Sequence, residues 1–261
     1  MRIGATQICF SDKPVAESLK YAKETGYESL ELGVRAEGEL SPGTDEAALR
    51  VMKREADRLG MAIPSLVPSM CAGFASGDPA VRAKALEGLR GSLRLANALG
   101  ADTILVHPGQ LTPQVRYDVM YRNVQEAMRQ VARDAERAKV YVGVENVWNK
   151  FLLSPLEAKG FVDEVGSDCI GVYFDIGNFV PWAFPEHWIE ILGSRIKKVH
   201  FKDFRRRGHE FVPLLEGDVD WAAVMKALRG IGYDSDVIQE VAGDEAGMRS
   251  TAEAMRKILA M

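Results

Sequence analysis

The sequence has few cysteines, and their scarcity excludes two common ways of stabilising a small protein. Its 261 residues include three cysteines, Cys9, Cys71 and Cys169, and no CxxC pair. An odd number of widely spaced thiols does not fit a disulfide framework or a structural zinc knuckle. The cysteine pattern predicts a reducing compartment, so we expect a cytoplasmic protein.

Long hydrophobic runs and an excess of positive charge are also missing. No apolar stretch approaches the roughly 18 residues that a membrane-spanning helix needs. The first residues, MRIGATQICF, are typical of a strand and lack the apolar region of a secretory signal. The formal net charge of -4 argues against nucleic acid or an anionic membrane as a partner. We therefore expect no nucleic-acid partner and no membrane partner.

Glycine-rich phosphate-binding motifs are absent as well. No GxGxxG follows the first expected strand, and GxxxxGK[ST] does not occur. These absences argue against a doubly wound nucleotide-binding sheet. No proline- or serine-rich linker divides the chain, which favours one domain.

What the sequence does contain is a repeated alternation of short aliphatic runs and longer segments of helical periodicity. We expect strands at residues 2–8, 27–34, 62–69, 101–109, 140–147, 169–177, 196–203 and 236–241. Clear helical patterns include residues 45–60, 78–100 and 116–139. Eight strand-helix units of about 33 residues are typical of an α/β fold of the (β/α)₈ class. The sequence therefore predicts one (β/α)₈ TIM barrel domain over residues 1–261.

Helix boundaries in this alternation are also marked in the sequence. Asp78-Pro79 and Ser154-Pro155 have the form of an N-cap followed by proline in the first turn. Glycines are expected to end helices just before strands, at Gly26, Gly60, Gly100, Gly166, Gly193 and Gly232.

Polar side chains end four consecutive expected strands. Glu145, Asp175, His200 and Glu240 occupy these positions, and the carboxyl ends of barrel strands form the active site in this fold. Any one of them alone would be an ordinary cap or salt bridge, but three carboxylates close together repel one another unless a cation lies among them. We predict that the four bind one divalent metal ion. Mn²⁺ is favoured for this oxygen-rich set with one imidazole, with Mg²⁺, Co²⁺ or Zn²⁺ as alternatives.

The sequence resembles the xylose-isomerase-like barrel superfamily of sugar isomerases and epimerases, near the ketose 3-epimerases and the ketose-phosphate epimerases and isomerases. The stretches that carry the resemblance are VGVENVWNKFLLSPLE, GVYFDIGN, IKKVHFKDFR and EGDVDWAAVMKALRGIGYDSDVIQEV. It implies that Glu145, Asp175, His200 and Glu240 bind one divalent metal. It also implies that Glu145 and Glu240 are the catalytic acid/base pair.

The resemblance implies epimerisation of a ketose or ketose phosphate at C3, through a cis-enediolate stabilised by the metal. An inosose dehydratase or a lyase acting on 3-keto sugars begins with the same proton abstraction, and both stay open as alternatives. An aldose–ketose isomerase and a non-catalytic sugar-binding barrel are further alternatives. A nuclease of the same fold would need more histidines than the four in this chain.

Two positions depart from the pattern of the ketose 3-epimerases. Asn178 stands where they have a histidine, and Phe151 stands where some have a glutamate. Asn178 can still donate a hydrogen bond to a substrate hydroxyl, but it cannot shuttle a proton. These changes leave the metal chemistry intact and leave the identity of the sugar open.

Several residues are candidates for contacts with a sugar or sugar phosphate. By resemblance Arg206 contacts the substrate, and Lys150 and Lys202 could join it; the alternative is a solvated charge cluster. His107 could bind substrate or tune Glu145, or be a buried core histidine.

Aromatic residues near the expected strand ends form a second set of candidates. Trp148, with Phe74, Trp182 and Phe184, could form an apolar wall against the sugar or belong to the core.

Four acidic positions are expected to have supporting roles. Glu31 could contact His107 or a substrate hydroxyl, or pair with Arg35. Asp203 could orient His200. Asp218 and Asp220 have the pattern of helix N-caps. Related barrels often pair, which leaves a homo-oligomer open, and the sequence does not show the oligomeric state.

Overall fold

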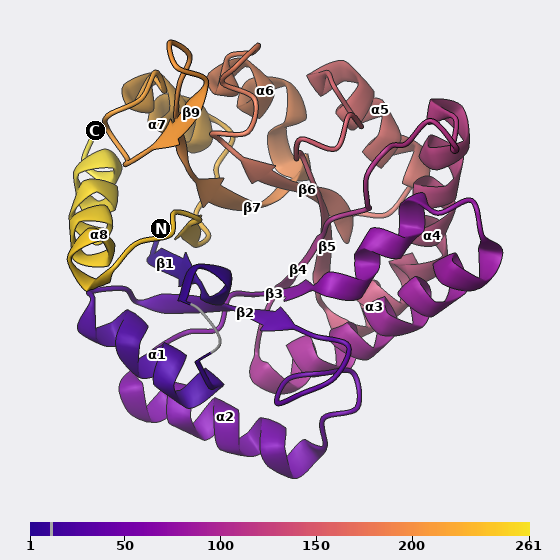
Figure 1. The fold of residues 1–261 in the computed structure, drawn as a ribbon, viewed down its shortest axis with the longest axis horizontal. Helices are drawn as coiled ribbons and strands as arrows, with labels where there is room; N and C mark the ends of the chain where they lie inside the picture. The colour runs from indigo at the N-terminus through magenta and orange to yellow at the C-terminus, as the bar shows by residue number, and fades with distance from the viewer. Residues whose placement is uncertain (11–12) are drawn as a thin grey trace.

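The strands of this protein close into a parallel barrel surrounded by helices. The computed structural model describes residues 1–10 and 13–261. The barrel order is β1-β10-β7-β6-β5-β4-β3-β2, and every neighbouring pair in it is parallel. In Figure 1 the strands form a central ring, and the helices lie around its outside. The predicted (β/α)₈ barrel is confirmed.

The eight barrel strands are shorter than the runs expected from the sequence. They are β1 (Ile3–Thr6), β2 (Ser29–Val34), β3 (Ser65–Pro68), β4 (Thr103–Val106), β5 (Tyr141–Glu145), β6 (Ile170–Asp175), β7 (Ile196–Phe201) and β10 (Val237–Gln239). The residues beyond each strand's carboxyl end belong to loops and short 3₁₀ turns at the mouth of the barrel.

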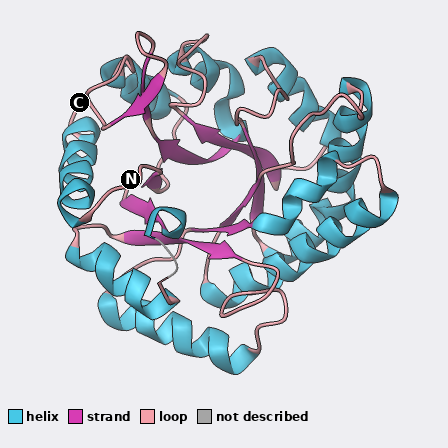
Figure 2. Ribbon diagram, in the orientation of Figure 1, coloured by secondary structure: helices cyan, strands magenta, loops and turns pink. Residues whose placement is uncertain are grey.

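A helix follows each barrel strand (Figure 2). These helices are α1 (Val15–Glu24), α2 (Glu46–Leu59), α3 (Pro79–Leu99), α4 (Tyr117–Ala138), α5 (Pro155–Val165), α6 (Pro185–Leu192), α7 (Trp221–Gly230) and α8 (Glu245–Leu259). Short 3₁₀ turns are η1 (Gln7–Phe10), η2 (Ser69–Ala75) and η3 (Gly193–Arg195). None of the helices in the described ranges is long and apolar enough to cross a bilayer.

The predicted helix boundaries are borne out where the capping chemistry is strongest. Asp78 accepts a hydrogen bond from Ala80 N and Ser154 accepts one from Glu157 N, with proline in the first turn of both helices. Gly60 and Gly100 end α2 and α3 in the left-handed conformation, with φ of 65° and 78°. Such a φ strains any residue with a Cβ, which explains the glycines.

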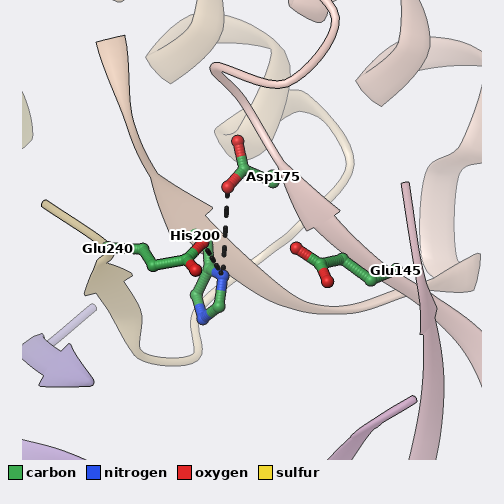
Figure 3. Close-up of side chains that lie close together, drawn as sticks. All are labelled: Glu145, Asp175, His200 and Glu240. Carbon is green, nitrogen blue, oxygen red and sulfur yellow. Dashed lines mark ion pairs between the residues drawn. The ribbon is translucent and has the colours of Figure 1, made fainter. Parts of the chain in front are cut away.

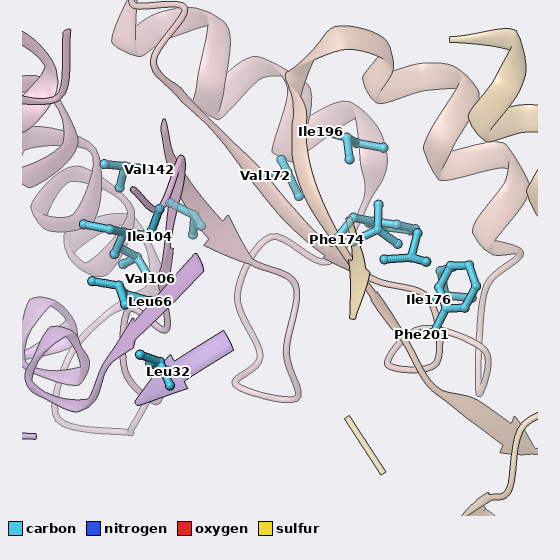
Figure 4. Close-up of a cluster of buried hydrophobic side chains, with 14 of the residues drawn as sticks. Leu32, Leu66, Ile104, Val106, Val142, Val172, Phe174, Ile176, Ile196 and Phe201 are labelled. Atoms are coloured by element: carbon cyan, nitrogen blue, oxygen red, sulfur yellow. The ribbon is translucent and has the colours of Figure 1, made fainter. Parts of the chain in front are cut away.

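The strands bury side chains on both faces. Outward-facing residues such as Leu32, Leu66, Ile104 and Val172 belong to the main hydrophobic core, which extends to the helices (Figure 4). A separate small cluster of Leu105, Tyr173 and Ile238 fills the barrel interior. Because side chains alternate along a strand, Asp175 shares the inward face with Tyr173, two residues earlier. The strand pattern thus aims Asp175 at the mouth of the barrel.

A short antiparallel hairpin, β8 (Asp203–Arg205) and β9 (Glu210–Val212), lies between β7 and α7. The sequence analysis gave no strands between residues 203 and 236, so this hairpin was missed. It carries part of the Arg205-Arg206-Arg207 run and places Phe211 near the mouth of the barrel.

Candidate metal and catalytic site

Four side chains from neighbouring strands meet at the mouth of the barrel. Glu145 ends β5, Asp175 ends β6, His200 lies in β7, and Glu240 directly follows β10. One ligand atom from each lies within 4.8 Å of the others. Figure 3 shows Glu145 and Glu240 approaching from opposite sides, with Asp175 and His200 between them in that view. The four predicted metal ligands are therefore brought together.

The atoms that face one another in this cluster are buried, and their polar contacts are ion pairs with one another and with Lys202. In the described part of the chain these atoms are Asp175 Oδ2, His200 Nδ1 and Glu240 Oε2. His200 Nδ1 lies 3.3 Å from Glu240 Oε2 and 4.0 Å from Asp175 Oδ2. Carboxylate oxygens with one imidazole nitrogen are donors that a divalent ion accepts, so the residues present fit such an ion.

The ring of His200 is oriented from the opposite wall of the barrel. Its Nε2 lies 3.0 Å from Glu31 Oε1, and both side chains are buried. Glu31 Oε2 in turn accepts hydrogen bonds from Ser65 Oγ at 2.6 Å and from the Tyr173 hydroxyl. With Nε2 held by Glu31, Nδ1 is the nitrogen that faces the cluster. His200 was not among the partners expected for Glu31.

Charge around His200 decides its protonation in the metal-free protein. Burial disfavours the charged ring, but the carboxylates of Glu31 and Glu240 raise the pKa of His200 well above its usual value. A metal ion that binds Nδ1 must therefore displace a proton.

Asp175 is fixed by two asparagines. Asn178 N donates to Asp175 Oδ1 at 2.9 Å, which leaves Oδ2 facing the cluster. Asn146 accepts from Asp175 N at 2.7 Å and donates to its carbonyl at 2.9 Å. Asn178 also donates to the Asn146 carbonyl at 3.0 Å and is buried. In this structure Asn178, predicted from sequence to bind substrate, supports the Asp175 carboxylate.

Lys202 places its ammonium among the ligand carboxylates. Its Nζ lies 2.7 Å from Glu240 Oε2 and 3.0 Å from Asp175 Oδ2. Burial disfavours the charged amine, but Asp175 and Glu240 raise the pKa of Lys202 above its usual value. The sequence analysis grouped Lys202 with Arg206 as a substrate contact, and did not anticipate that it would pair with two of the four candidate metal ligands.

The pKa values of the two glutamates of the cluster shift in opposite directions. Burial, followed by the nearby charge of Glu240, raises the pKa of Glu145 to about 8. Burial acts on Glu240 in the same sense, but His200 and Lys202 outweigh it and lower the pKa of Glu240 well below its usual value. At neutral pH the metal-free site holds Glu145 protonated and Glu240 ionised.

A comparison with known protein families matches residues 19–258 to the xylose isomerase-like TIM barrel family. The chain belongs to this family. The resemblance given by the four ligands and the strand stretches around them is thereby confirmed.

Curated relatives and solved structures agree with the family. A putative L-ribulose-5-phosphate 3-epimerase of Escherichia coli strain K12 is 28% identical over 256 residues, covering 88% of this chain and 84% of the relative. An L-ribulose-5-phosphate 3-epimerase of Escherichia coli O157:H7 strain EC4115 is 28% identical over 250 residues, covering 88% and 83%. The crystal structure of D-psicose 3-epimerase from Clostridium cellulolyticum H10 superposes with a TM-score of 0.84 at 19% identity and covers 99% of both chains. That last likeness shows a shared fold.

Aromatic side chains form a partly exposed rim beside the cluster. Trp148 donates from Nε1 to the Asn178 carbonyl at 2.5 Å and is 38% exposed. Its ring contacts those of Trp182, Phe204, His209 and Phe211. Phe74, which the sequence analysis added to the same wall, is fully buried and belongs to the core.

Arg206 and His107 make local contacts next to this rim. Arg206 donates from Nε to the Val180 carbonyl at 2.9 Å and from Nη2 to the Ala183 carbonyl at 3.0 Å, so it ties down the loop after β6. His107 directly follows β4, and its Nδ1 accepts from Gly109 N at 3.2 Å. Burial lowers the pKa of His107, which favours the neutral ring.

Two supporting roles expected from the sequence were wrong. Asp203 accepts hydrogen bonds from Phe204 N, Leu215 N, Gly217 N, Val219 N and Trp221 Nε1, so it organises the loop around the β8–β9 hairpin and not His200. Asp220 caps α7 as expected, whereas Asp218 accepts from Arg206 N and caps no helix. Both errors arise because an acidic residue's sequence neighbours do not specify which backbone amides reach it.

Proposed function

We propose that this protein is a divalent-metal-dependent epimerase that inverts ketoses or ketose phosphates at C3. The convergence of Glu145 and Glu240 from opposite sides of one buried ligand cluster carries the proposal. The names of the relatives support it, because L-ribulose-5-phosphate 3-epimerases are among them. One-base chemistry would not need a second carboxyl on the far side of the cluster.

Inverting a carbon next to a carbonyl requires that a proton leave one face and another arrive on the opposite face. Glu240, ionised, is placed to remove the first proton, and this leaves a cis-enediolate of the sugar. Glu145, protonated, is placed to deliver the second. In the reverse direction the two exchange roles. In the metal-free protein the pKa of Glu145 is raised and that of Glu240 is lowered, so the two carboxyls differ in proton affinity before the ion binds.

The remaining cluster residues hold the site in shape for this exchange. Asp175 and His200, with the two glutamates, would hold the divalent ion. When bound, that ion supplies positive charge beside the negative charge that develops on the sugar oxygens. Glu31 fixes the orientation of the His200 ring through Nε2, and Asn178 N binds Asp175 Oδ1, so that Asp175 Oδ2 faces the cluster.

The substrate contacts are assigned to residues at the mouth. Trp148 offers an apolar surface to the carbon face of the sugar and limits water access. His107 lies close enough to Glu240 to be affected by its charge, and is assigned a hydrogen bond to a sugar hydroxyl. Asn178 and Arg206 are also assigned to substrate binding, because both hold the loop after β6 that borders the site.

The test is proton exchange in deuterated water. Protein loaded with Mn²⁺ is incubated with free and phosphorylated ketoses, beginning with L-ribulose 5-phosphate, and the products are followed by NMR. Deuterium at C3 together with an inverted C3 is the expected result. Deuterium at C1 or C2 of an aldose–ketose pair would identify an isomerase, and loss of water would identify a dehydratase.

Two controls separate catalysis from background exchange. Metal-free protein and the Asp175→Asn variant should leave C3 protonated. Substrate binding without any exchange in the loaded protein would contradict the proposal and would fit a sugar-binding barrel.

A further inference from the structure

The ammonium of Lys202 occupies an unusual position for a cation in a metal site. Its side chain is 12% exposed, and its Nζ contacts Asp175 Oδ2 and Glu240 Oε2 at 3.0 and 2.7 Å. Both oxygens are buried and face the interior of the cluster. In the described part of the chain, no other lysine or arginine is ion-paired with a ligand carboxylate.

Packing holds Lys202 in this position. The ring of Phe211 lies 4.9 Å from Nζ, on the β9 strand of the hairpin. Asn178 Oδ1 lies 3.5 Å from Nζ on another side. Gly177 packs so closely that a Cβ there would lie 2.8 Å from Lys202 Cβ. The lysine is thus enclosed by β9 and by the loop after β6.

Charge balance gives this arrangement a chemical meaning. The cluster contains three carboxylates, and a divalent ion neutralises two of their charges. The ammonium of Lys202 neutralises the third, so the ion and the lysine together balance the three carboxylates of the cluster. The same ammonium contacts oxygens that the ion requires, and it repels the ion at short range.

We infer that Lys202 is a built-in counter-ion that competes with the divalent ion for Asp175 and Glu240 and positions the Glu240 carboxylate for proton transfer. This inference rests on the proposed function and adds to it that metal affinity is held below its maximum by a positioning residue. Its removal should tighten metal binding and slow the reaction, a combination that a merely structural lysine would not produce.

The experiment measures Mn²⁺ affinity by calorimetry and epimerisation kinetics for four proteins. Lys202→Met removes the charge and keeps most of the chain length, and Lys202→Arg keeps the charge. Lys197→Met is the matched control: Lys197 lies on β7 but donates to the Ser194 carbonyl, away from the cluster. We expect Lys202→Met to bind Mn²⁺ at least about tenfold more tightly than wild type, with kcat lowered at least about tenfold. Lys202→Arg and Lys197→Met should stay within about threefold of the wild-type Mn²⁺ affinity.

Thermal unfolding adds a readout that does not depend on activity. Metal-free Lys202→Met should unfold at a lower temperature than wild type, and saturating Mn²⁺ should remove the difference. Unchanged or weaker Mn²⁺ binding in Lys202→Met would overturn the inference. A Lys202→Met protein that stays unfolded in saturating Mn²⁺ would also overturn it, because the ion would then fail to replace the ammonium.

Wild-type protein separates this inference from the proposed function. Wild type could bind Mn²⁺ and epimerise ketoses while Lys202→Met binds Mn²⁺ no more tightly than wild type. That result would refute only the role of Lys202. If wild type neither binds Mn²⁺ nor exchanges the C3 proton, both the proposed function and this inference are refuted.

Discussion

Glu31 and His200 face each other across the inside of the barrel, with Glu31 Oε1 3.0 Å from His200 Nε2. They lie on β2 and β7, on different arcs of the strand ring, and both are buried. Burial opposes ionisation of Glu31, but the charge of His200 lowers the pKa of Glu31 below its usual value. The pair fixes which ring nitrogen faces the cluster.

Removing the charge of Glu31 should weaken metal binding although all four candidate ligands remain in place. We expect Glu31→Gln to bind Mn²⁺ about 10–100-fold more weakly, because the His200 ring loses its charged partner. Calorimetric titration with Mn²⁺ measures this. Glu39→Gln is the control, since Glu39 accepts from Val15 N at the start of α1 and not from a metal ligand. Wild-type affinity in Glu31→Gln would show that the pair does not govern the site.

The two-carboxyl mechanism predicts that either glutamate is indispensable for turnover. Glu240→Gln should lower kcat by roughly 10²–10⁴-fold while retaining some bound metal, and Glu145→Gln should behave alike. Epimerisation is followed by NMR beside metal analysis of the same sample. Glu210→Gln, an exposed change on β9, should leave kcat unchanged. Near-normal turnover in Glu240→Gln would refute its role as acid or base.

The metal-free protein should lose stability as pH rises from about 4.5 to about 8. Glu145, with a pKa of about 8 against a usual 4.5, binds more protons folded than unfolded across this range. The raised pKa of His200 acts in the same direction above its usual 6.5. Because the folded state then holds the extra protons, raising the pH favours unfolding. The lowered pKa values of Glu31 and Glu240 act below this window.

Calorimetric melting with and without saturating Mn²⁺ checks this pH dependence. The ion binds the deprotonated groups, so the difference in melting temperature between loaded and metal-free protein should grow with pH. A difference that stays constant from pH 5 to 8 would contradict the assigned proton affinities.

Asp203 should affect stability and leave metal binding alone. Its buried carboxylate accepts bonds from four backbone amides and the Trp221 ring nitrogen. Asp203→Asn should lower the free energy of unfolding by about 2–3 kcal/mol, because those donors lose a charged acceptor. Urea unfolding measures the change, and Mn²⁺ affinity should stay within about threefold of wild type. A large loss of Mn²⁺ affinity at unchanged stability would restore the discarded role of Asp203 in orienting His200.

The barrel and the cluster of four candidate ligands were predictable because both depend on local patterns. Alternating strands and helices, with caps such as Ser154 and stops such as Gly100, are marked residue by residue in the chain. In a parallel barrel every strand ends on the same side, so Asp175 and Glu240 were expected at the same mouth of the barrel once the fold was known.

The contacts behind the ligands were not predictable in the same way. Glu31 and His200 are 169 positions apart, and nothing near either residue specifies the other. The ammonium of Lys202 was read as a substrate contact because a lysine's flexible stem can reach in several directions. Alternation along the strand held the missed signal: Lys202 lies two residues after His200, on the same inward face.

Titration of metal-free protein with Mn²⁺, beside the Asp175→Asn variant, tests the central claim most directly. The account predicts one ion bound per wild-type chain and at least about a 100-fold loss of affinity in Asp175→Asn. Absence of Mn²⁺ binding to wild type, or equal binding by both proteins, would contradict it.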